Sequence, residues 1–179
     1  MKILIYLSVT CLLLLLFITS AIFIHLNNNS RPLTKREITE LQSVFYEDVN
    51  YSKTMITSSS LPPAMAAIVF GNHIVYRKEY HIEDFGDDFM KMGRLVHEIC
   101  HVWSNQTKGI QTSLIAATEH LRYKDQVYAH DVLTGDKALD EFRYEQQCRI
   151  LNDFYINRHF EFDTSAYEMT IYKTIKDIK

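Results

Sequence analysis

The 179-residue sequence has little of what marks loop-rich, disulfide-rich or nucleic-acid-binding proteins. It contains 5 glycines and 3 prolines, so few long loops are expected. Its 3 cysteines form no Cys-x-x-Cys pair, which argues against a zinc ribbon or a thioredoxin-like redox motif. The formal net charge is −3, and no basic stretch is interleaved with aromatic residues, so nucleic acid is not an expected partner. No internal repeat is present, which excludes solenoid folds.

A long apolar run is present at the amino terminus. Residues 3–24 carry no charge and follow Lys2. As a helix, this run would extend about 33 Å, enough to cross a hydrocarbon core of about 30 Å. We predict that residues 1–26 form a transmembrane anchor or signal sequence and that residues 27–33 form a linker. The favoured location is the inner membrane, with a single-pass anchor and the domain in the periplasm; secretion after signal cleavage is the alternative.

Residues 34–179 have the length of one ordinary domain with its own core. A capping box from Thr34 to Glu37 opens the first helix, and Gly71-Asn72 is typical of a tight hairpin turn. Apolar residues at helical spacing follow the hairpin. The expected elements are a helix over 34–47, a strand over 51–57, a loop over 58–63, hairpin strands over 66–70 and 73–77, and helices over 88–105 and 139–155. This order predicts an α+β fold with a small sheet.

The stretch GRLVHEICHVWSNQ, residues 93–106, contains His97, Glu98 and His101 in the spacing His-Glu-x-x-His. On a helix, His97 and His101 leave the same face one turn apart and can reach one metal ion. Glu98 lies about 100° around the helix, which suits a base for a metal-bound water. The pattern therefore indicates zinc-dependent hydrolysis, in which water attacks a polarised carbonyl. Because the motif is short, it can also arise by chance. The alternative is an amphipathic helix with two surface histidines.

A catalytic zinc site usually has three protein ligands. The metzincin extension of the motif is absent, because Ser104 and Thr107 stand where its glycine and third histidine should be. The downstream stretch LDEFRYEQQCRILNDFY, residues 139–155, offers Glu141, Glu145 and Asp153. Spacing alone does not choose among them, since acidic residues on a helix usually form its solvated face.

Three stretches together carry a family resemblance: AAIVFGNHIVYRKEY, LVHEICHVWSNQ and YEQQCRILNDFY. They resemble the Vgr-related zinc peptidases akin to the core domain of extracellular contractile injection systems. In that family a glycine-turn segment precedes a His-Glu-x-x-His-Val-Trp-Gln motif, and a Glu-Gln-Gln segment follows. The resemblance covers residues 62–155 and implies a zincin-like fold, with Glu145 as the third zinc ligand. Two residues differ from the family pattern: Ser104 stands in place of its Gln, and Cys100 stands in place of a residue that is commonly Thr. Because neither residue is a ligand or the base, these differences bear on the choice of substrate more than on metal binding.

The leading hypothesis is a zinc metallopeptidase in which His97, His101 and Glu145 bind Zn²⁺ and Glu98 is the general base. Its substrate would be a peptide or protein, with envelope proteins, peptidoglycan cross-links and secretion components as candidates. The alternative is a non-enzymatic, zinc-stabilised accessory or scaffold protein of an envelope secretion or injection apparatus. An effector enzyme is a third class, less favoured because an anchor would hinder delivery. Trp103 is interpreted as core, and no role is assigned to His120, Tyr123, Tyr128, His130 or Arg143.

The two cysteines of the domain, Cys100 and Cys148, follow His97 and Glu145 by three residues each. Each thiol is therefore about 60° from a ligand on its own helix. If one ion draws the two helices together, both cysteines can approach the same seam. A disulfide there needs Cα atoms within about 7 Å. The alternative is two separate buried thiols.

Overall fold

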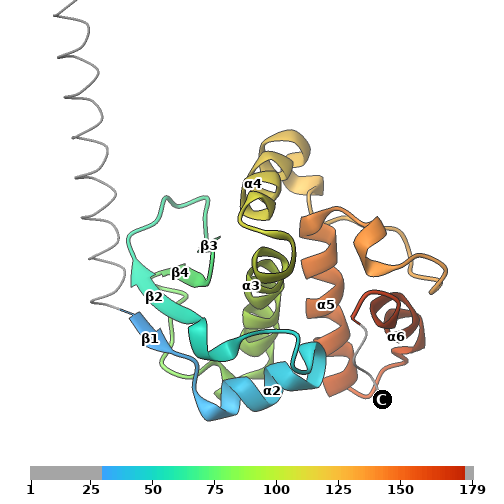
Figure 1. The fold of residues 1–179 in the computed structure, drawn as a ribbon, viewed down its shortest axis with the longest axis horizontal. Coiled ribbons are helices and arrows are strands. Elements are labelled where there is room, and N and C mark those ends of the chain that lie inside the picture. The colour runs from blue at the N-terminus through green and yellow to red at the C-terminus, as the bar shows by residue number, and fades with distance from the viewer. Residues whose placement is uncertain (1–29, 176–179) are drawn as a thin grey trace, which may run out of the picture. The chain divides into compact units, whose positions relative to one another are not determined.

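A small mixed sheet and a long central helix organise residues 30–175, the part of the chain that this computed structural model describes (Figure 1). In Figure 1 the helix α3 lies between the strands of the sheet and α5. The strands are β1 (Ser30–Pro32), β2 (Met55–Ser59), β3 (Ala67–Phe70) and β4 (His73–Arg77). The helices are α2 (Lys35–Phe45), α3 (Phe89–Lys108), α4 (Gln111–Tyr123), α5 (Tyr144–His159) and α6 (Ser165–Tyr172). The predicted α+β class is confirmed. Helices α4 and α6 were not predicted from the sequence.

The sheet has the strand order β1-β2-β4-β3. Strand β4 pairs antiparallel with β3, and Phe70 lies opposite His73, so the turn between them consists of Gly71 and Asn72. Gly71 has a φ of +60°, a backbone conformation that glycine adopts without steric cost. The predicted hairpin is therefore confirmed.

The predicted strand over 51–57 is wrong in its first half. Tyr51–Lys53 form a 3-10 turn, in which the Thr54 backbone N–H donates to the Tyr51 carbonyl. Strand β2 begins only at Met55 and runs through Ser58 and Ser59, the first two residues of the predicted loop over 58–63. Parallel pairing with β4 extends the strand, because Ser58 and Ser59 lie opposite residues of β4. Pairing with a neighbouring strand thus outweighs the weak strand preference of serine.

The capping box at the start of α2 is confirmed and has a second role. The Glu37 backbone N–H donates to the Thr34 hydroxyl at 3.1 Å, and the Thr34 backbone N–H donates to Glu37 Oε2 at 2.8 Å. The other carboxylate oxygen of Glu37 accepts from the Phe85 backbone N–H at 2.9 Å. One buried carboxylate therefore ties α2 to the 3-10 turn Phe85–Asp87, which leads into α3.

Helix α3 begins after Asp88, whose side chain accepts from the backbone N–H groups of Met90 and Lys91. The predicted core stripe is buried at Met92, Val96, Ile99 and Trp103. Phe89, at the first turn, is partly buried and packs against the edge of the core. The helix ends at Gly109, with a φ of +93°. Because the sheet, α2, α4 and α5 all contact α3, its buried surface also includes Leu95, Val102 and several further residues.

The predicted helix over 139–155 is two elements. Leu139–Glu141 form a 3-10 turn, and α5 begins at Tyr144 because Phe142 and Arg143 are extended. Helix α5 then packs closely on α3. A Cβ atom at Gly93 would come within 2.9 Å of both Asn152 Oδ1 and the Ile156 side chain. The absence of a side chain at Gly93 therefore permits the close approach of the two helices.

The apolar run at residues 3–24 lies outside the described residues, so its predicted role as a membrane anchor or signal sequence stays a prediction. Between residues 30 and 175, no helix is long and apolar enough to cross a membrane. Helix α3 has the 20 residues needed, but charged side chains at Lys91, Arg94 and Glu98 make it amphipathic.

Candidate metal centre

Three side chains from the two packed helices converge at the predicted site. His97 and His101 lie one turn apart on α3, and Glu145 lies in the first turn of α5. Each offers one ligand atom, and these three atoms all lie within 4.8 Å of one another. Two imidazoles and a carboxylate are the ligand set of known catalytic zinc sites. The structure thus brings together the residues that the motif and the family resemblance had selected.

The interatomic distances suit a tetrahedral ion. His97 Nε2 is 3.3 Å from Glu145 Oε2, and His101 Nε2 is 3.5 Å from Glu145 Oε1. Two ligand atoms of a tetrahedral zinc ion are about 3.3–3.4 Å apart, since each bond is about 2.0–2.1 Å long. The His97–Glu145 pair already has this spacing, and the three ligand atoms, all within 4.8 Å of one another, would tighten around a bound ion.

The carboxylate of Glu145 lies in a surrounding that favours its charged form. Its side chain is 3% exposed, and among the described residues Oε2 forms an ion pair with His97 Nε2 at 3.3 Å that lacks hydrogen-bond geometry. Burial alone would raise the pKa of this carboxyl, but the imidazoles of His101, His120 and His97 hold it well below its usual range. A buried carboxylate oxygen without a donor is normally costly, and a metal ion would satisfy it.

His120 on α4 also belongs to the cluster, although no role was predicted for it. Its Nε2 lies 2.9 Å from Glu145 Oε1, and its side chain is 46% exposed. The ring of Tyr128 lies edge-on to His97 and His120, with centroid distances of 5.6 and 5.5 Å. His120 therefore holds one oxygen of the carboxylate and leaves the other free for a metal ion. Ligating carboxylates commonly have such a second partner.

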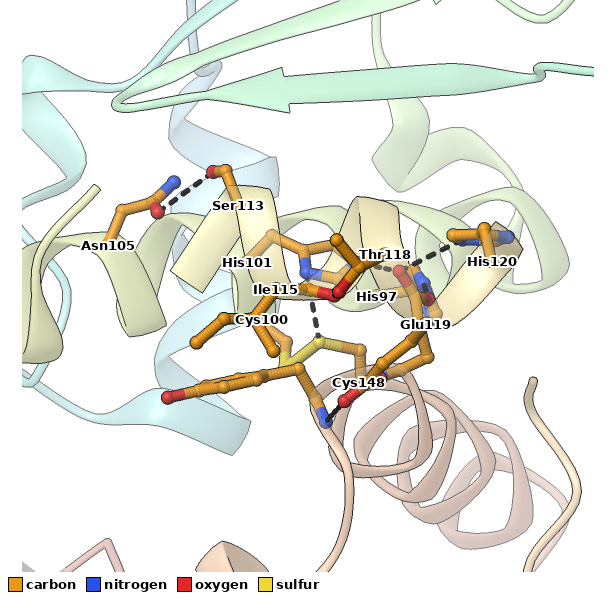
Figure 2. A network of polar contacts seen from close by, with 12 residues as sticks. His97, Cys100, His101, Asn105, Ser113, Ile115, Thr118, Glu119, His120 and Cys148 are labelled. Carbon is orange, nitrogen blue, oxygen red and sulfur yellow. Dashed lines mark hydrogen bonds and ion pairs between the residues drawn. A yellow bond between two sulfur atoms is a disulfide. The ribbon is translucent and has the colours of Figure 1, made fainter. Parts of the chain in front are cut away.

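Glu119, the neighbour of His120, positions the ligand helix. Its carboxylate accepts from the Tyr144 backbone N–H at 3.2 Å and from the Glu145 backbone N–H at 3.0 Å. These two N–H groups open α5 and have no partner within the helix. Figure 2 shows Glu119 and His120 in the same polar network as His97 and Cys148. Neither residue was identified from the sequence, because helix α4 itself was not predicted.

Glu98, the predicted base, lies partly buried beside the cluster. Burial raises the pKa of its carboxyl, while the neighbouring His97 and His101 partly offset the rise. A carboxylate with a raised pKa accepts a proton more readily than an ordinary glutamate, as a general base requires.

Cys100 and Cys148 form a disulfide, with Cα atoms 5.2 Å apart. This bridge joins α3 to α5 next to the ligands and resolves the two alternatives that the sequence left open. Nδ1 of His101 lies 3.6 Å from the Cys148 sulfur, the contact drawn as a dashed line in Figure 2.

The other candidate ligands have different partners. Glu141 accepts from the Ala138 backbone N–H at 2.7 Å, and Asp153 pairs with Arg149 at 2.8 Å. Trp103 is buried, as its assignment to the core predicted. The guanidinium of Arg143 stacks over the Tyr123 ring at 3.8 Å, and His130 lies 4.0 Å from Asp153. None of these contacts involves His97, His101 or Glu145.

Comparison with known proteins relates the chain to a secretion-system spike. No family model matches the chain. It is 26% identical over 144 residues to the type VI secretion system spike protein VgrG2b of Pseudomonas aeruginosa, and the matched part is 76% of this chain and 14% of that protein. The solved effector domain of P. aeruginosa VgrG2b resembles the structure with a TM-score of 0.64 at 26% identity. That match covers 76% of this chain and 79% of the effector-domain chain. The predicted Vgr relation is supported.

These comparisons correct the predicted location. The sequence suggested an inner-membrane protein with a single-pass anchor and a periplasmic domain. The solved structure that it resembles is instead an effector domain of a spike protein. The helices within residues 30–175 also provide no membrane span. The likeness to this effector domain therefore contradicts the predicted inner-membrane location.

Removing the Glu119 carboxylate should loosen the start of α5. In Glu119→Ala both N–H groups lose their acceptor, and loss of a helix cap costs about 0.5–2 kcal/mol of unfolding free energy. We expect weaker zinc binding as well, because Glu145 is one of the two residues capped. Urea unfolding and competition with a chelator measure the two effects. Glu119→Gln, which keeps one acceptor oxygen, should lie between Glu119→Ala and wild type; unchanged values in Glu119→Ala would contradict the capping role.

Stability and zinc affinity should depend on pH in opposite directions. The hydrogen bond to Glu145 raises the pKa of His120. Burial lowers the pKa of His101, but the hydrogen bond and negative charge of Glu145 raise it by more, so the net change is upward. A histidine with a raised pKa stabilises the folded state below its unfolded pKa of about 6.5, and the effect is lost as pH rises through the folded pKa. The metal-free protein should thus lose stability above about pH 6.5. Zinc needs neutral imidazoles, so its affinity should rise over the same range.

Urea unfolding of the metal-free protein and chelator competition, each measured across this pH range, test the expectation. The variant His120→Gln should show a weaker pH dependence of stability, because one of the two titrating imidazoles is removed. Metal-free stability that is constant or rises with pH would show that these histidines are not held protonated by Glu145.

Proposed function

We propose that this chain is a zinc-dependent peptidase with a zincin-like active site. The observation that carries the proposal is the convergence of His97, His101 and Glu145 from two helices, with the motif carboxylate of Glu98 beside them. A zinc ion held there would polarise a peptide carbonyl and lower the pKa of a water molecule. Supporting this proposal, a small sheet lies against the His-Glu-x-x-His helix, as the zincin-like prediction requires.

The residues of the chain have separate roles in this proposal. Glu98 takes the proton of the attacking water and passes it to the leaving amine, for which its raised pKa is suited. His120 holds one oxygen of Glu145 and so orients the carboxylate. Burial, together with the charges of Glu145 and Glu98, raises the pKa of Tyr128, so its hydroxyl stays protonated and able to donate a hydrogen bond. Tyr128 lies against His97 and His120, where a substrate carbonyl can accept from it.

The biological setting is proposed from the comparisons. The chain matches most of an effector domain but only a small part of the whole spike protein. We therefore propose an enzyme that acts as an effector of a contractile secretion system, with a peptide or protein substrate. The effector class, less favoured from sequence, is now preferred because the solved domain that the chain resembles is an effector domain. The competing function is a non-enzymatic, zinc-stabilised scaffold of the same apparatus, which the spike relationship also suits.

One substitution separates the enzyme from the scaffold. We expect wild type and Glu98→Gln each to bind about one zinc per chain, because Glu98 is not a ligand. Cleavage of a mixed peptide library, followed by mass spectrometry, should fall by about 100- to 10,000-fold in Glu98→Gln, the usual contribution of a general base. Zinc-loaded wild type that cleaves no better than Glu98→Gln would support the scaffold.

Three further variants test the metal assignment. His97→Ala and Glu145→Ala should lose zinc and cleavage together. Glu141→Ala should keep both, because Glu141 caps the turn before α5 and does not reach the site. Loss of zinc in Glu141→Ala with retention in Glu145→Ala would overturn the assignment of the third ligand.

A further inference from the structure

The disulfide and the candidate metal ligands link the same two helices. Cys100 lies directly before His101 on α3, and Cys148 lies one turn after Glu145 on α5. Both cysteines are 0% exposed. The bridge therefore fixes the separation of α3 and α5 at the turns that carry the ligands, in a buried layer of the domain.

One sulfur of the bridge also contacts a ligand directly. Nδ1 of His101 lies 3.6 Å from Cys148 Sγ, while Nε2 of the same ring faces Glu145. The hydrogen bond made by one ring nitrogen decides which tautomer a histidine adopts and which nitrogen is left to bind a metal. A donor bond from Nδ1–H to the sulfur leaves the Nε2 lone pair directed to the site. Cys148 thus occupies the place that a carboxylate or backbone carbonyl usually takes behind a metal-binding histidine.

We propose that the Cys100–Cys148 disulfide is a redox-dependent positioning element of the metal centre, so that zinc binds more tightly to the oxidised protein than to the reduced one. This inference rests on the proposed zinc site. A dithiol reductant would supply two electrons and two protons, break the S–S bond, form two thiols and leave as its own disulfide. Oxidation by a disulfide-class oxidant reverses the step.

Reduction must disturb the site because its surroundings are close-packed. Two thiol sulfurs cannot remain at a covalent bond length, and a packed interior has no spare room. At Gly93, α5 already approaches so closely that no side chain would fit without a shift. The helices must therefore move apart at the ligand layer, or the Cys148 side chain must turn away from His101. Either change disturbs the geometry of His101 and Glu145, and loss of such supporting contacts typically weakens metal binding about 10- to 100-fold.

The coupling is reciprocal. If the disulfide strengthens zinc binding by some factor, zinc must favour the disulfide over the dithiol by the same factor. Two measurements on the same protein thus report one quantity: the zinc affinity of the two redox forms, and the fraction of disulfide with and without zinc.

The test uses the full chain with Cys11→Ser, so that Cys100 and Cys148 are its only cysteines and every thiol comes from reduction of the bridge. Zinc dissociation constants are measured by competition with a chromophoric chelator on the oxidised protein and on protein that was reduced and then freed of reductant without oxygen. We expect about 10- to 100-fold weaker binding after reduction. Cys100→Ala/Cys148→Ser keeps an acceptor for His101 without the bridge and should lose less affinity than Cys100→Ala/Cys148→Ala. Neither variant should respond to reductant.

Equal zinc affinity in the oxidised, reduced and doubly substituted proteins, each with a folded circular dichroism spectrum, would overturn the inference and leave the disulfide as a brace for stability alone. Should reduction or substitution unfold the chain, titration of free thiols in a glutathione redox buffer decides: zinc must lower the dithiol fraction, and no change with zinc contradicts the coupling. Oxidised protein that binds no zinc would instead refute the proposed metal site.

Discussion

The buried carboxylate of Glu145 is the constraint on which the site depends. With 3% of its side chain exposed, it is charged in an interior that disfavours charge. Three histidines compensate, two from α3 and one from α4, and their proximity keeps its pKa low. Such a cluster is costly to build without a further cation, because Glu145 raises the pKa of both His101 and His120, whose positive charges then repel each other. A divalent ion removes this cost, since neutral imidazoles can share it with the carboxylate.

The rest of the fold keeps that carboxylate in place. Glu119 on α4 accepts from the first N–H groups of α5, Gly93 allows α5 to approach α3, and the disulfide joins the two helices at the ligand layer. The sheet packs against α3 through β3 and β4. Sites built on rigid helices hold their geometry better than sites on loops. The chemistry proposed for Glu98 requires this rigidity, because a base must lie within hydrogen-bond reach of the proton it takes.

The sequence predicted the elements whose causes are local. The capping box of α2, the Gly71-Asn72 hairpin and the stripe of α3 depend on neighbouring residues, and each is found. The prediction of a strand over 51–57 was partly wrong because the extent of β2 depends on its pairing with β4. Glu145 was identified through family resemblance, since periodicity could not distinguish it from Glu141 and Asp153. Glu119 and His120 were missed because their role depends on where α4 packs; Glu119, for example, precedes its partners Tyr144 and Glu145 by 25 and 26 residues.

The central claim is that His97, His101 and Glu145 hold one zinc ion between α3 and α5. A crystal structure of the zinc-loaded protein, with anomalous diffraction data on both sides of the zinc absorption edge, tests it most directly. The account predicts one strong anomalous peak within bonding distance of Nε2 of both histidines and of a Glu145 oxygen, with His120 still bonded to the other oxygen. A peak elsewhere, or none at this cluster with the three side chains still in mutual contact, would contradict it.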